Sequence, residues 1–437
     1  MRTAPILALA VALSAASPAR AFCGFFVGKA DGKLFNKSSQ VAIVRDGDRT
    51  VITMGNDFQG EMTEFALVVP VPTVLSREQI HVGERKLLER LDAYSAPRLV
   101  EYHDGDPCAV YPYAAMKMGV MRSMPVAASP PKEMAKALGV TVEAEYTVGE
   151  YDIVLLSANQ SDGLEAWLRE SGYKIPAHAS KALAPYIRQQ MKFFVAKVNI
   201  KEQRKSGYQA LRPIQIAFES PRFMLPIRLG MANADGPQDM IVYAITRNGR
   251  VESSNYQTVK MPSDVELPEF VQHQFGNFYK SAFAKAWNDH GRHAILTEYV
   301  WNMGFCDPCA APPLEQEELK QLGVFWLEGS YHGGGMPLTL TRLHVRYDAE
   351  HFPEDLAFQE TGDQGTFQGR YILRHPFRGE MTCAAAGNYR QELDRRRREE
   401  AKTLASLTGW DMARIHAGMG RDAPVDQPDP WWKKLWQ

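Results

Sequence analysis

The sequence predicts an α+β fold, with β-rich N-terminal and middle regions that contain hairpins and inserted helices, followed by a helical C-terminal segment. Short apolar or alternating runs, bounded by turn residues, recur through most of the chain and are typical of strands. From residue 388 onward the sequence becomes charged and takes on helical spacing. Because strands, helices and hairpins do not alternate regularly, this order favours an α+β arrangement over a regularly wound βαβ sheet.

The N-terminal region predicts a hairpin and a buried strand. Residues 40–54 form two strand-like runs around Asp46 and Gly47, which accept the positive φ of a tight turn, and residues 239–256 repeat this pattern around an Asn-Gly pair. Residues 64–72 are almost wholly apolar and end at two prolines, as is typical of a buried strand. Further strands are expected at residues 150–158, 191–200, 294–305, 337–347 and 369–377.

Helices are expected at residues 76–94, with Ser76 as the cap, and at residues 161–171, 180–190, 274–290 and 388–407. One of them presents aromatic side chains four residues apart: Phe275, Tyr279, Phe283 and Trp287. This spacing puts the four rings on one helix face, which predicts packing in the core.

These elements divide the chain into five parts. They are a signal peptide (1–21), an α+β domain (22–270) with a candidate sub-boundary near 124–134, a helix plus strands that include a Cys-x-x-Cys segment (271–387), a charged helical segment (388–420), and a Pro/Asp linker with a Trp-rich tail (421–437). The sub-boundary rests on a Pro- and Ala-rich stretch.

The first 21 residues are typical of an export signal. A short positive start at Met1 and Arg2 precedes an apolar run, and Ala19 and Ala21 supply the small-x-small cleavage pattern. We expect cleavage after Ala21 and a periplasmic or secreted protein. The run is too short to span a membrane and no later stretch reaches about 18 apolar residues, so no transmembrane helix is expected after signal removal.

The charge pattern gives no basis for a nucleic-acid partner. The formal net charge is -1 at pH 7, whereas nucleic-acid-binding chains usually present a basic surface. An arginine run within residues 388–407 is followed four residues on by Glu399 and Glu400. Opposite charges at that spacing predict a solvated helix face.

The chain has five cysteines, and in an exported protein all are disulfide candidates: Cys23, Cys108, Cys306, Cys309 and Cys383. An odd number permits at most two bridges within one chain, and the pairing stays open. A bridge from the Cys-x-x-Cys pair to Cys23 or Cys108 would close a long loop, for which the chain-entropy model predicts a stabilisation of several kcal/mol.

The pair Cys306 and Cys309 allows three interpretations. A redox centre needs a thiol of lowered pKa, usually at a helix N-terminus, but residues 310–313 prevent a helix there and Asp307 would raise the pKa of a neighbouring thiol. A metal site needs four ligands, and neither a second Cys-x-x-Cys nor a diagnostic histidine spacing supplies the other two. A structural disulfide is therefore favoured.

Other motifs predict turns rather than sites. Residues 331–337 resemble an esterase oxyanion loop, but no Gly-x-Ser-x-Gly nucleophile motif accompanies them. His290 and His293 mark a helix C-terminus, and residues 102–108 and 233–239 have clustered oxygens without the EF-hand glutamate. We therefore expect no metal and no cofactor.

The C-terminal tail predicts a contact surface. Trp431, Trp432, Leu435 and Trp436 would share one face of a helical turn, beside two lysines. A helix this short is marginal in water, so it needs a surface or stays disordered. That surface is the protein's own body, a partner protein, or a membrane interface, where tryptophan and lysine are common.

A resemblance extends over residues 22–377. It rests on the stretches FCGFFVGKADGKLFNKSSQV, FALVVPVP, APRLVEY with the following DPC, CDPC, TRLHVRY and GRYILRHPF. These stretches are similar to a family of exported bacterial proteins catalogued as domain of unknown function 2330. The resemblance implies an exported bacterial protein and assigns no activity to any residue.

These observations favour an exported protein of unknown activity, stabilised by disulfides, that binds a protein or envelope partner without catalysis. The alternative is a periplasmic thiol–disulfide oxidoreductase in which Cys306 attacks and Cys309 resolves. Binding is preferred to an enzymatic role because no complete catalytic constellation is evident, and a hydrolase is disfavoured because no nucleophile motif is present.

Overall fold

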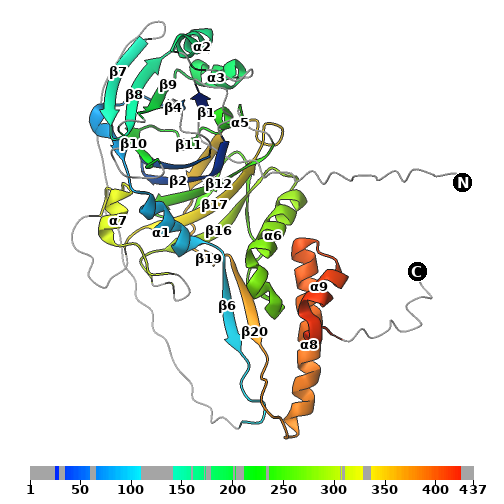
Figure 1. Ribbon diagram of the computed structural model, residues 1–437. Coiled ribbons are helices and arrows are strands. Elements are labelled where there is room, and N and C mark those ends of the chain that lie inside the picture. The colour runs from blue at the N-terminus through cyan, green and yellow to red at the C-terminus, as the bar shows by residue number, and fades with distance from the viewer. Residues whose placement is uncertain are drawn as a thin grey trace, which may run out of the picture.

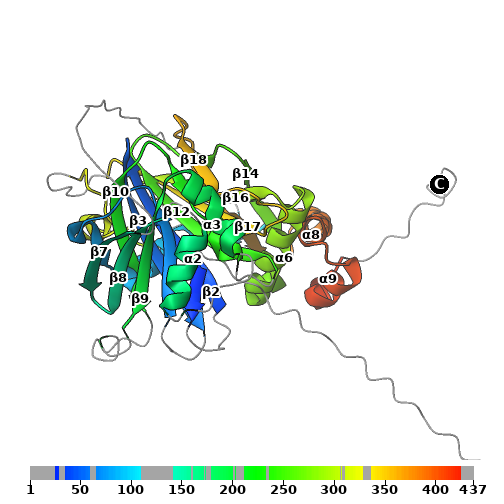
Figure 2. The ribbon, with the colours of Figure 1, turned by 90° about the horizontal axis from the view of Figure 1, so that it is seen from above.

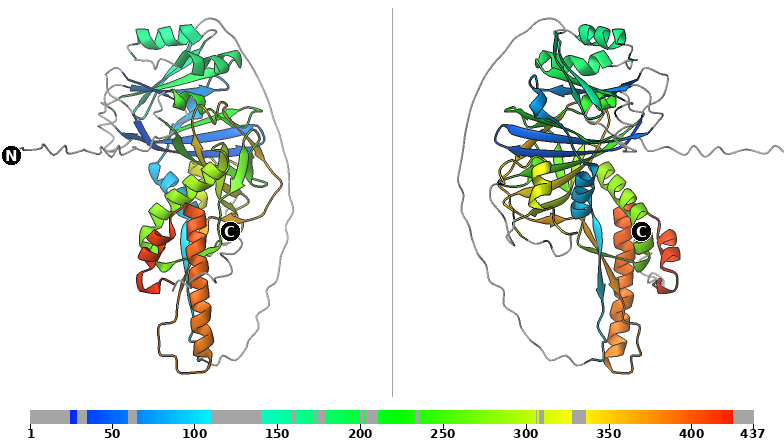
Figure 3. Two further views of the ribbon diagram at one scale, coloured as in Figure 1. Left: turned by 90° about the vertical axis from the view of Figure 1, so that its right-hand side faces the viewer. Right: turned by 60° about the vertical axis from the view of Figure 1, so that its left-hand side comes forward.

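The computed structural model describes residues 25–28, 35–59, 65–109, 141–158, 161–171, 173, 179–199, 202, 211–232, 236–305, 307, 311–327 and 336–424. Two β-sheets pack face to face at the centre, and helices cover their outer faces (Figure 1). An extension of strands and helices leads away from the sheets (Figure 3). Strands and helices in this mixed arrangement confirm the α+β class and the helical C-terminal segment.

The first sheet, as far as the structure describes it, has the order β1-β4-β9-β8-β7. Its strands are β1 (Phe25–Gly28), β4 (Phe65–Val71), β9 (Lys192–Val198), β8 (Tyr151–Ser157) and β7 (Thr141–Val148). All neighbours in it are antiparallel. Helices α2 (Ser161–Glu170) and α3 (Ala179–Arg188) lie over its outer face (Figure 2).

The second sheet has the order β14-β16-β17-β12-β2-β3-β10-β5, with β19 paired to β16. Its strands are β14 (Gln257–Lys260), β16 (Ala294–Asn302), β17 (Thr339–Tyr347), β12 (Gln238–Thr246), β2 (Phe35–Asp46), β3 (Arg49–Gln59), β10 (Ile214–Glu219), β5 (Ile80–Val82) and β19 (Phe367–Gln368). Helices α1 (Arg85–Ser95) and α7 (Gln316–Gln321) lie against the face turned away from the first sheet. Strand β2 pairs with β12 in parallel, as edge strand β14 does with β16, and the other neighbours in this sheet are antiparallel.

The alternation of side chains along the strands explains the layers. In β2, Val41 and Ile43 pack in the core between the two sheets, whereas Ala42 and Val44 pack on the opposite face. Successive side chains of a strand point to opposite faces, so a strand covered on both sides must be apolar throughout. Strand β4 meets this requirement and confirms the buried strand predicted over residues 64–72.

The extension combines a small sheet with the C-terminal helices. Its strands are β15 (Val265–Leu267), β20 (Arg370–His375) and β6 (Arg98–His103), in the order β15-β20-β6. Around it lie η2 (Glu269–Gln274), α6 (Phe275–Asp289), α8 (Ala385–Thr408), α9 (Met412–Met419) and η3 (Gly420–Asp422). Phe283 and Trp287 of α6 are buried in one core with Leu404 of α8, which confirms the aromatic helix face as a packing face.

Three short elements lie beside the sheets: β11 (Met224–Leu225), β18 (Leu356–Glu360) and β13 (Val251–Ser253), which pair in the order β11-β18-β13. The short helix α5 (Arg228–Met231) follows β11. The predicted hairpin at residues 239–256 is therefore wrong, because β13 after the Asn248-Gly249 turn pairs with β18. Strand β12 already has β2 on one edge and β17 on the other, so it offers no edge to a returning strand.

The single helix predicted over residues 76–94 is also wrong. The Ser76 cap starts one 3-10 turn, η1 (Arg77–Gln79), which ends where Ile80 enters β5. Ile80 and Val82 are buried and pair with β10. Helix α1 begins only at Arg85. Burial of the two β-branched residues beside β10 outweighs the local helix signal.

The hairpin around Asp46 and Gly47 is confirmed. Gly47 has a φ of 60°, and β2 and β3 pair from Asp46↔Arg49 onward. The expected strands at residues 150–158, 191–200, 294–305, 337–347 and 369–377 correspond to β8, β9, β16, β17 and β20, and the expected helices at 161–171, 180–190, 274–290 and 388–407 correspond to α2, α3, α6 and α8.

Candidate functional site

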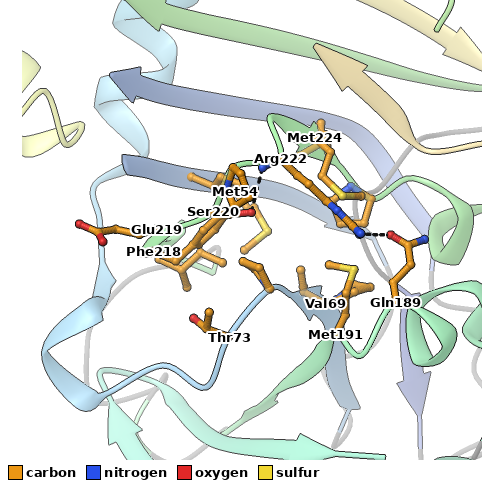
Figure 4. Close-up of a pocket in the computed structure, with 17 residues that line it drawn as sticks. Met54, Val69, Thr73, Gln189, Met191, Phe218, Glu219, Ser220, Arg222 and Met224 are labelled. Atoms are coloured by element: carbon orange, nitrogen blue, oxygen red, sulfur yellow. Dashed lines mark hydrogen bonds between the residues drawn. The ribbon is translucent and has the colours of Figure 1, made fainter. Parts of the chain in front are cut away.

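A cavity of about 220 Å³ opens between the two sheets (Figure 4). Its walls come from β3, β4, β10 and β11 together with the segment before β9, which are far apart in the sequence. The lining is mainly apolar, and Met54, Met191 and Met224 contribute three flexible side chains. Methionine adapts its shape to irregular apolar surfaces, so this wall suits an apolar ligand whose fit is not rigidly specified. We call this space the inter-sheet cavity.

The inner wall of the inter-sheet cavity is buried and the rim is polar. Ile52, Ile216 and Leu225 are each less than 5 % exposed. Exposed polar side chains stand at the opening: Thr73, Gln189, Glu219 and Arg222. An apolar interior with a few polar groups at its mouth is the usual composition of a small-molecule site.

The rim segment that includes Arg222 is held by the buried guanidinium of Arg45. Arg45 Nη2 donates to the Ser220 carbonyl (3.1 Å), and Nη1 donates to the Arg222 carbonyl (3.4 Å) and to Thr50 Oγ1 (2.8 Å). Burial lowers the pKa of Arg45, while the charges of Asp48 and Glu360 act in the opposite direction. The rim is thus fixed by the fold before any ligand arrives.

A second group of polar side chains is buried on the second sheet around Glu298, and we call it the Glu298 network. Glu298 lies in β16 where the register with β17 shifts, as in a β-bulge. Its carboxylate accepts from Arg342 Nε at 2.6 Å and from Tyr279, and Oε1 lies 2.7 Å from His344 Nδ1. All three partners converge on a side chain with no exposed surface.

The Glu298 network extends to a helix and a third strand. Arg342 Nη1 donates to Asp92 Oδ1 of α1 at 2.7 Å. His344 Nε2 lies 3.3 Å from Asp239 Oδ1 of β12, and the His344 ring stacks on Phe283 of α6 with ring centroids 3.8 Å apart. The network therefore joins β12, β16 and β17 to α1 and α6.

Mutual attraction sets the charge states of this network. Burial would raise the pKa of Glu298, but the charges of His344 and Arg342 outweigh it and lower the pKa to about 2. Burial likewise opposes ionisation of Asp239, yet His344 and Arg346 bring its pKa to about 2. The two carboxylates in turn raise the pKa of His344 against the effect of burial. Because the His344 side chain is 13 % exposed and Glu298 not at all, these groups cross-link the fold rather than face a ligand.

A polar cleft of about 230 Å³ lies between η2, β20, α8 and α9. Arg396 of α8 contributes to it and donates to Asp104 Oδ2 at 2.8 Å, with its Nε 3.5 Å from Glu400 Oε1. The predicted i,i+4 pair with Glu400 is therefore present. The expectation of a wholly solvated arginine face is wrong at Arg396, whose side chain is only 18 % exposed because it anchors α8 to the end of β6.

Glu400 provides a test of this cleft. Burial raises its pKa to about 7, against the attraction of Arg396. A carboxyl whose pKa is higher in the folded state destabilises the fold increasingly as pH rises from 4.5 to about 7. We expect Glu400→Gln to increase the free energy of unfolding by about 2 kcal/mol at pH 8 and by little at pH 5. Urea unfolding at both pH values checks this, with the exposed Glu399→Gln as control; an equal gain at both pH values would contradict it.

The structure locates some of the predicted site residues. Cys108 and Cys383 form a disulfide, so two of the five disulfide candidates are paired with each other. A bridge from the Cys-x-x-Cys pair to Cys108 is thereby excluded. The remaining candidates, Cys23, Cys306 and Cys309, and the contact residues Trp431, Trp432, Leu435 and Trp436 lie outside the described residues.

Other predicted positions behave as turns or helix ends. Helix α6 ends at Asp289, and Gly291 follows with a φ of 67°, which confirms the helix C-terminus at His290. Asp106 Oδ1 accepts from the Cys108 backbone N at 2.8 Å, an Asx turn. Asp307, between the two cysteines, is buried and accepts from the Tyr299 hydroxyl at 2.8 Å.

The described residues contain neither a metal-binding cluster nor a membrane-spanning helix. Within them, no three or more histidine, cysteine, aspartate or glutamate side chains are grouped so that they could hold a metal ion. Nor does this part of the chain contain a helix long and apolar enough for a membrane span.

Sequence reasoning missed both the inter-sheet cavity and the Glu298 network. The cavity has no local motif, because its walls are contributed by distant strands. The network has two signals in the sequence. In TRLHVRY, Arg342, His344 and Arg346 alternate with apolar residues, and Glu298 is the single carboxylate within an apolar run. Cations alternating along one strand, with a single acid in another apolar strand, are the signal that could have indicated a buried ion network.

Comparison with known proteins identifies a family but no activity. No curated protein and no solved structure matches the chain. A family model described as an uncharacterised protein conserved in bacteria (DUF2330) matches residues 17–359, a span that includes the first sheet, every strand of the second sheet except β19, and the inter-sheet cavity. The chain therefore belongs to this bacterial family, DUF2330.

Proposed function

We propose that this protein acts outside the cytoplasm as a binding protein and that it holds an apolar small molecule in the inter-sheet cavity. The observation that supports it most is the cavity itself, which has a buried apolar wall and a polar rim. Proteins rarely leave such a space between packed sheets without using it, because interiors are otherwise close-packed.

The lining favours binding over a reaction. Among the described residues, the cavity lining contains no histidine, cysteine, aspartate or lysine. Its Ser220 hydroxyl accepts from the Arg222 backbone N at 3.1 Å, and the carboxylate of the lining residue Glu219 pairs with Arg49 and points away from the cavity (Figure 4). Activation of a serine nucleophile needs a general base beside it. The cavity is thus suited to recognition and transport or sensing of a ligand.

Two observations support a location outside the cytoplasm. The N-terminal residues have the pattern of a cleavable export signal. The Cys108–Cys383 disulfide is typical of oxidising compartments. Attachment to an envelope partner through the Trp-rich tail remains a prediction from the sequence.

Filling the cavity tests the proposal. Val69 of β4 lines the space and points into it (Figure 4), so Val69→Phe places a ring where the ligand would lie. We expect the neutral probe N-phenyl-1-naphthylamine to bind the wild-type protein with a saturable fluorescence increase. Val69→Phe should weaken this binding about ten-fold, which corresponds to ~1.4 kcal/mol.

Val142→Phe is the matched control. Val142 lies on β7 of the same sheet but is 44 % exposed, so the substitution adds the same ring at the surface. Circular dichroism and thermal unfolding establish that both variants fold. The proposal fails if the wild-type protein shows no saturable binding or if Val69→Phe binds the probe as well as the wild type does.

A further inference from the structure

The rim of the inter-sheet cavity has a cation, Arg222, that no carboxylate neutralises in the part of the chain that the structure describes. Arg222 Nη1 donates to the amide oxygen of Gln189, and this is a neutral partner. Within the described residues, the structure records no ion pair between Arg222 and a carboxylate. An exposed guanidinium held at the mouth of an apolar space is free to pair with an anion.

The acidic residue on the same rim is already paired. Glu219 forms an ion pair with Arg49, with Oε1 3.3 Å from Nε. In Figure 4 the Glu219 carboxylate points away from the cavity, whereas Arg222 extends along its edge toward Gln189. The electrostatic character of the opening is therefore positive on the side of Arg222.

The position of this cation is set by the backbone. Arg45 holds the carbonyls of the segment Ser220 to Arg222, and the Ser220 backbone N donates to the Asp48 carbonyl at 2.9 Å. Pro221 further restricts the segment. A preorganised donor loses less entropy on binding, so even an exposed guanidinium can contribute to affinity here.

We propose that the ligand of the inter-sheet cavity is a single-chain amphiphile with an anionic carboxylate head, that is, a fatty acid. Its chain lies between the sheets against Met54 and Met191, and its carboxylate pairs with Arg222 at the rim. This inference rests on the proposed function and adds the class of ligand to it.

Three decyl compounds that differ only in the head group test the assignment. Decanoate, decan-1-ol and decyltrimethylammonium displace N-phenyl-1-naphthylamine from the full-length protein in a competition titration. We expect decanoate to bind about ten-fold more tightly than decan-1-ol, and the cation to bind most weakly. Arg222→Gln should remove the preference for decanoate and leave decan-1-ol binding unchanged, and Arg222→Lys should retain part of the preference.

Arg188→Gln is the control for net charge. Arg188 is an exposed arginine at the end of α3 and does not line the cavity, so its loss should leave the preference for decanoate intact. If decanoate and decan-1-ol bind the wild-type protein equally, or if Arg222→Gln keeps the preference, the carboxylate assignment is overturned while the cavity remains a binding site. If neither the probe nor any decyl compound binds, the proposed function itself fails.

Discussion

Replacing Glu298 by glutamine is expected to lower the free energy of unfolding by about 3–5 kcal/mol, the usual cost of breaking a buried ion pair on one side. Glutamine preserves the shape of the side chain and removes its charge. The guanidinium of Arg342, with a side chain only 7 % exposed, and the buried His344 would then lack their central counter-ion. Urea unfolding at pH 6 measures the loss.

The pH dependence gives this prediction a second readout. Glu298 has a folded pKa lowered from 4.5 to about 2, so its contribution is present above pH 4.5 and is lost as pH falls toward 2. The pKa of His344 is raised above 6.5, so the stabilisation from its charge is present below pH 6.5 and is lost as pH rises through the folded pKa. The difference between wild type and Glu298→Gln should therefore be largest between pH 4.5 and 6.5.

The control for this experiment is Glu392→Gln. Glu392 of α8 is 67 % exposed and pairs with Arg395, so its loss should change stability by no more than about 0.5 kcal/mol. A Glu298→Gln protein as stable as the wild type at pH 6 would show that the buried network contributes no net stability.

Loss of the Cys108–Cys383 disulfide is expected to cost about 2–5 kcal/mol of stability. The two cysteines are 275 residues apart in sequence, and cross-linking so long a loop restricts the unfolded chain strongly in the chain-entropy model. The bridge joins the segment that follows β6 to the residues before α8. Its removal should therefore loosen the extension before it affects the two packed sheets.

The double variant Cys108→Ser/Cys383→Ser isolates this effect. Urea unfolding with and without a reductant should show a much larger reductant effect in the wild type than in the double variant. Mass spectrometry of the unreduced protein establishes the pairing directly. A reductant effect that persists in the double variant would indicate a second bridge, and a different partner for Cys108 would refute the assignment.

Elements whose signal is local could be predicted from the sequence. The turn at Gly47 needs a positive φ, and β4 needs apolar residues on both faces, so each leaves a recognisable pattern. Residues 76–94 and 239–256 were mispredicted because strand pairing decided their structure. Ile80 is drawn into β5 by β10, and the strand after Gly249 pairs with β18 because both edges of β12 are occupied.

The candidate site was less predictable for the same physical reason. Arg222 and Val69 line the same cavity only because the two sheets pack face to face. No spacing in the sequence encodes the packing of one sheet on the other. Cys108 and Cys383 were predictable as disulfide candidates because the predicted compartment and the cysteine count suffice for that inference. Which cysteines pair depends on how β6 and α8 are placed, so the Cys108–Cys383 bridge could not be chosen from the ten possible pairs of five cysteines.

The parallel pairing of β2 with β12 has a consequence for biogenesis. Val41 pairs with Val242, so β2 has one unsatisfied edge until the middle of the chain has emerged. Such non-local pairing slows folding, and an open edge strand is a template for aggregation. A chaperone that keeps the N-terminal half unfolded until β12 and β17 are available would protect this edge during synthesis. We expect chains truncated before β12 to aggregate even though β2, β3 and β4 are complete within them.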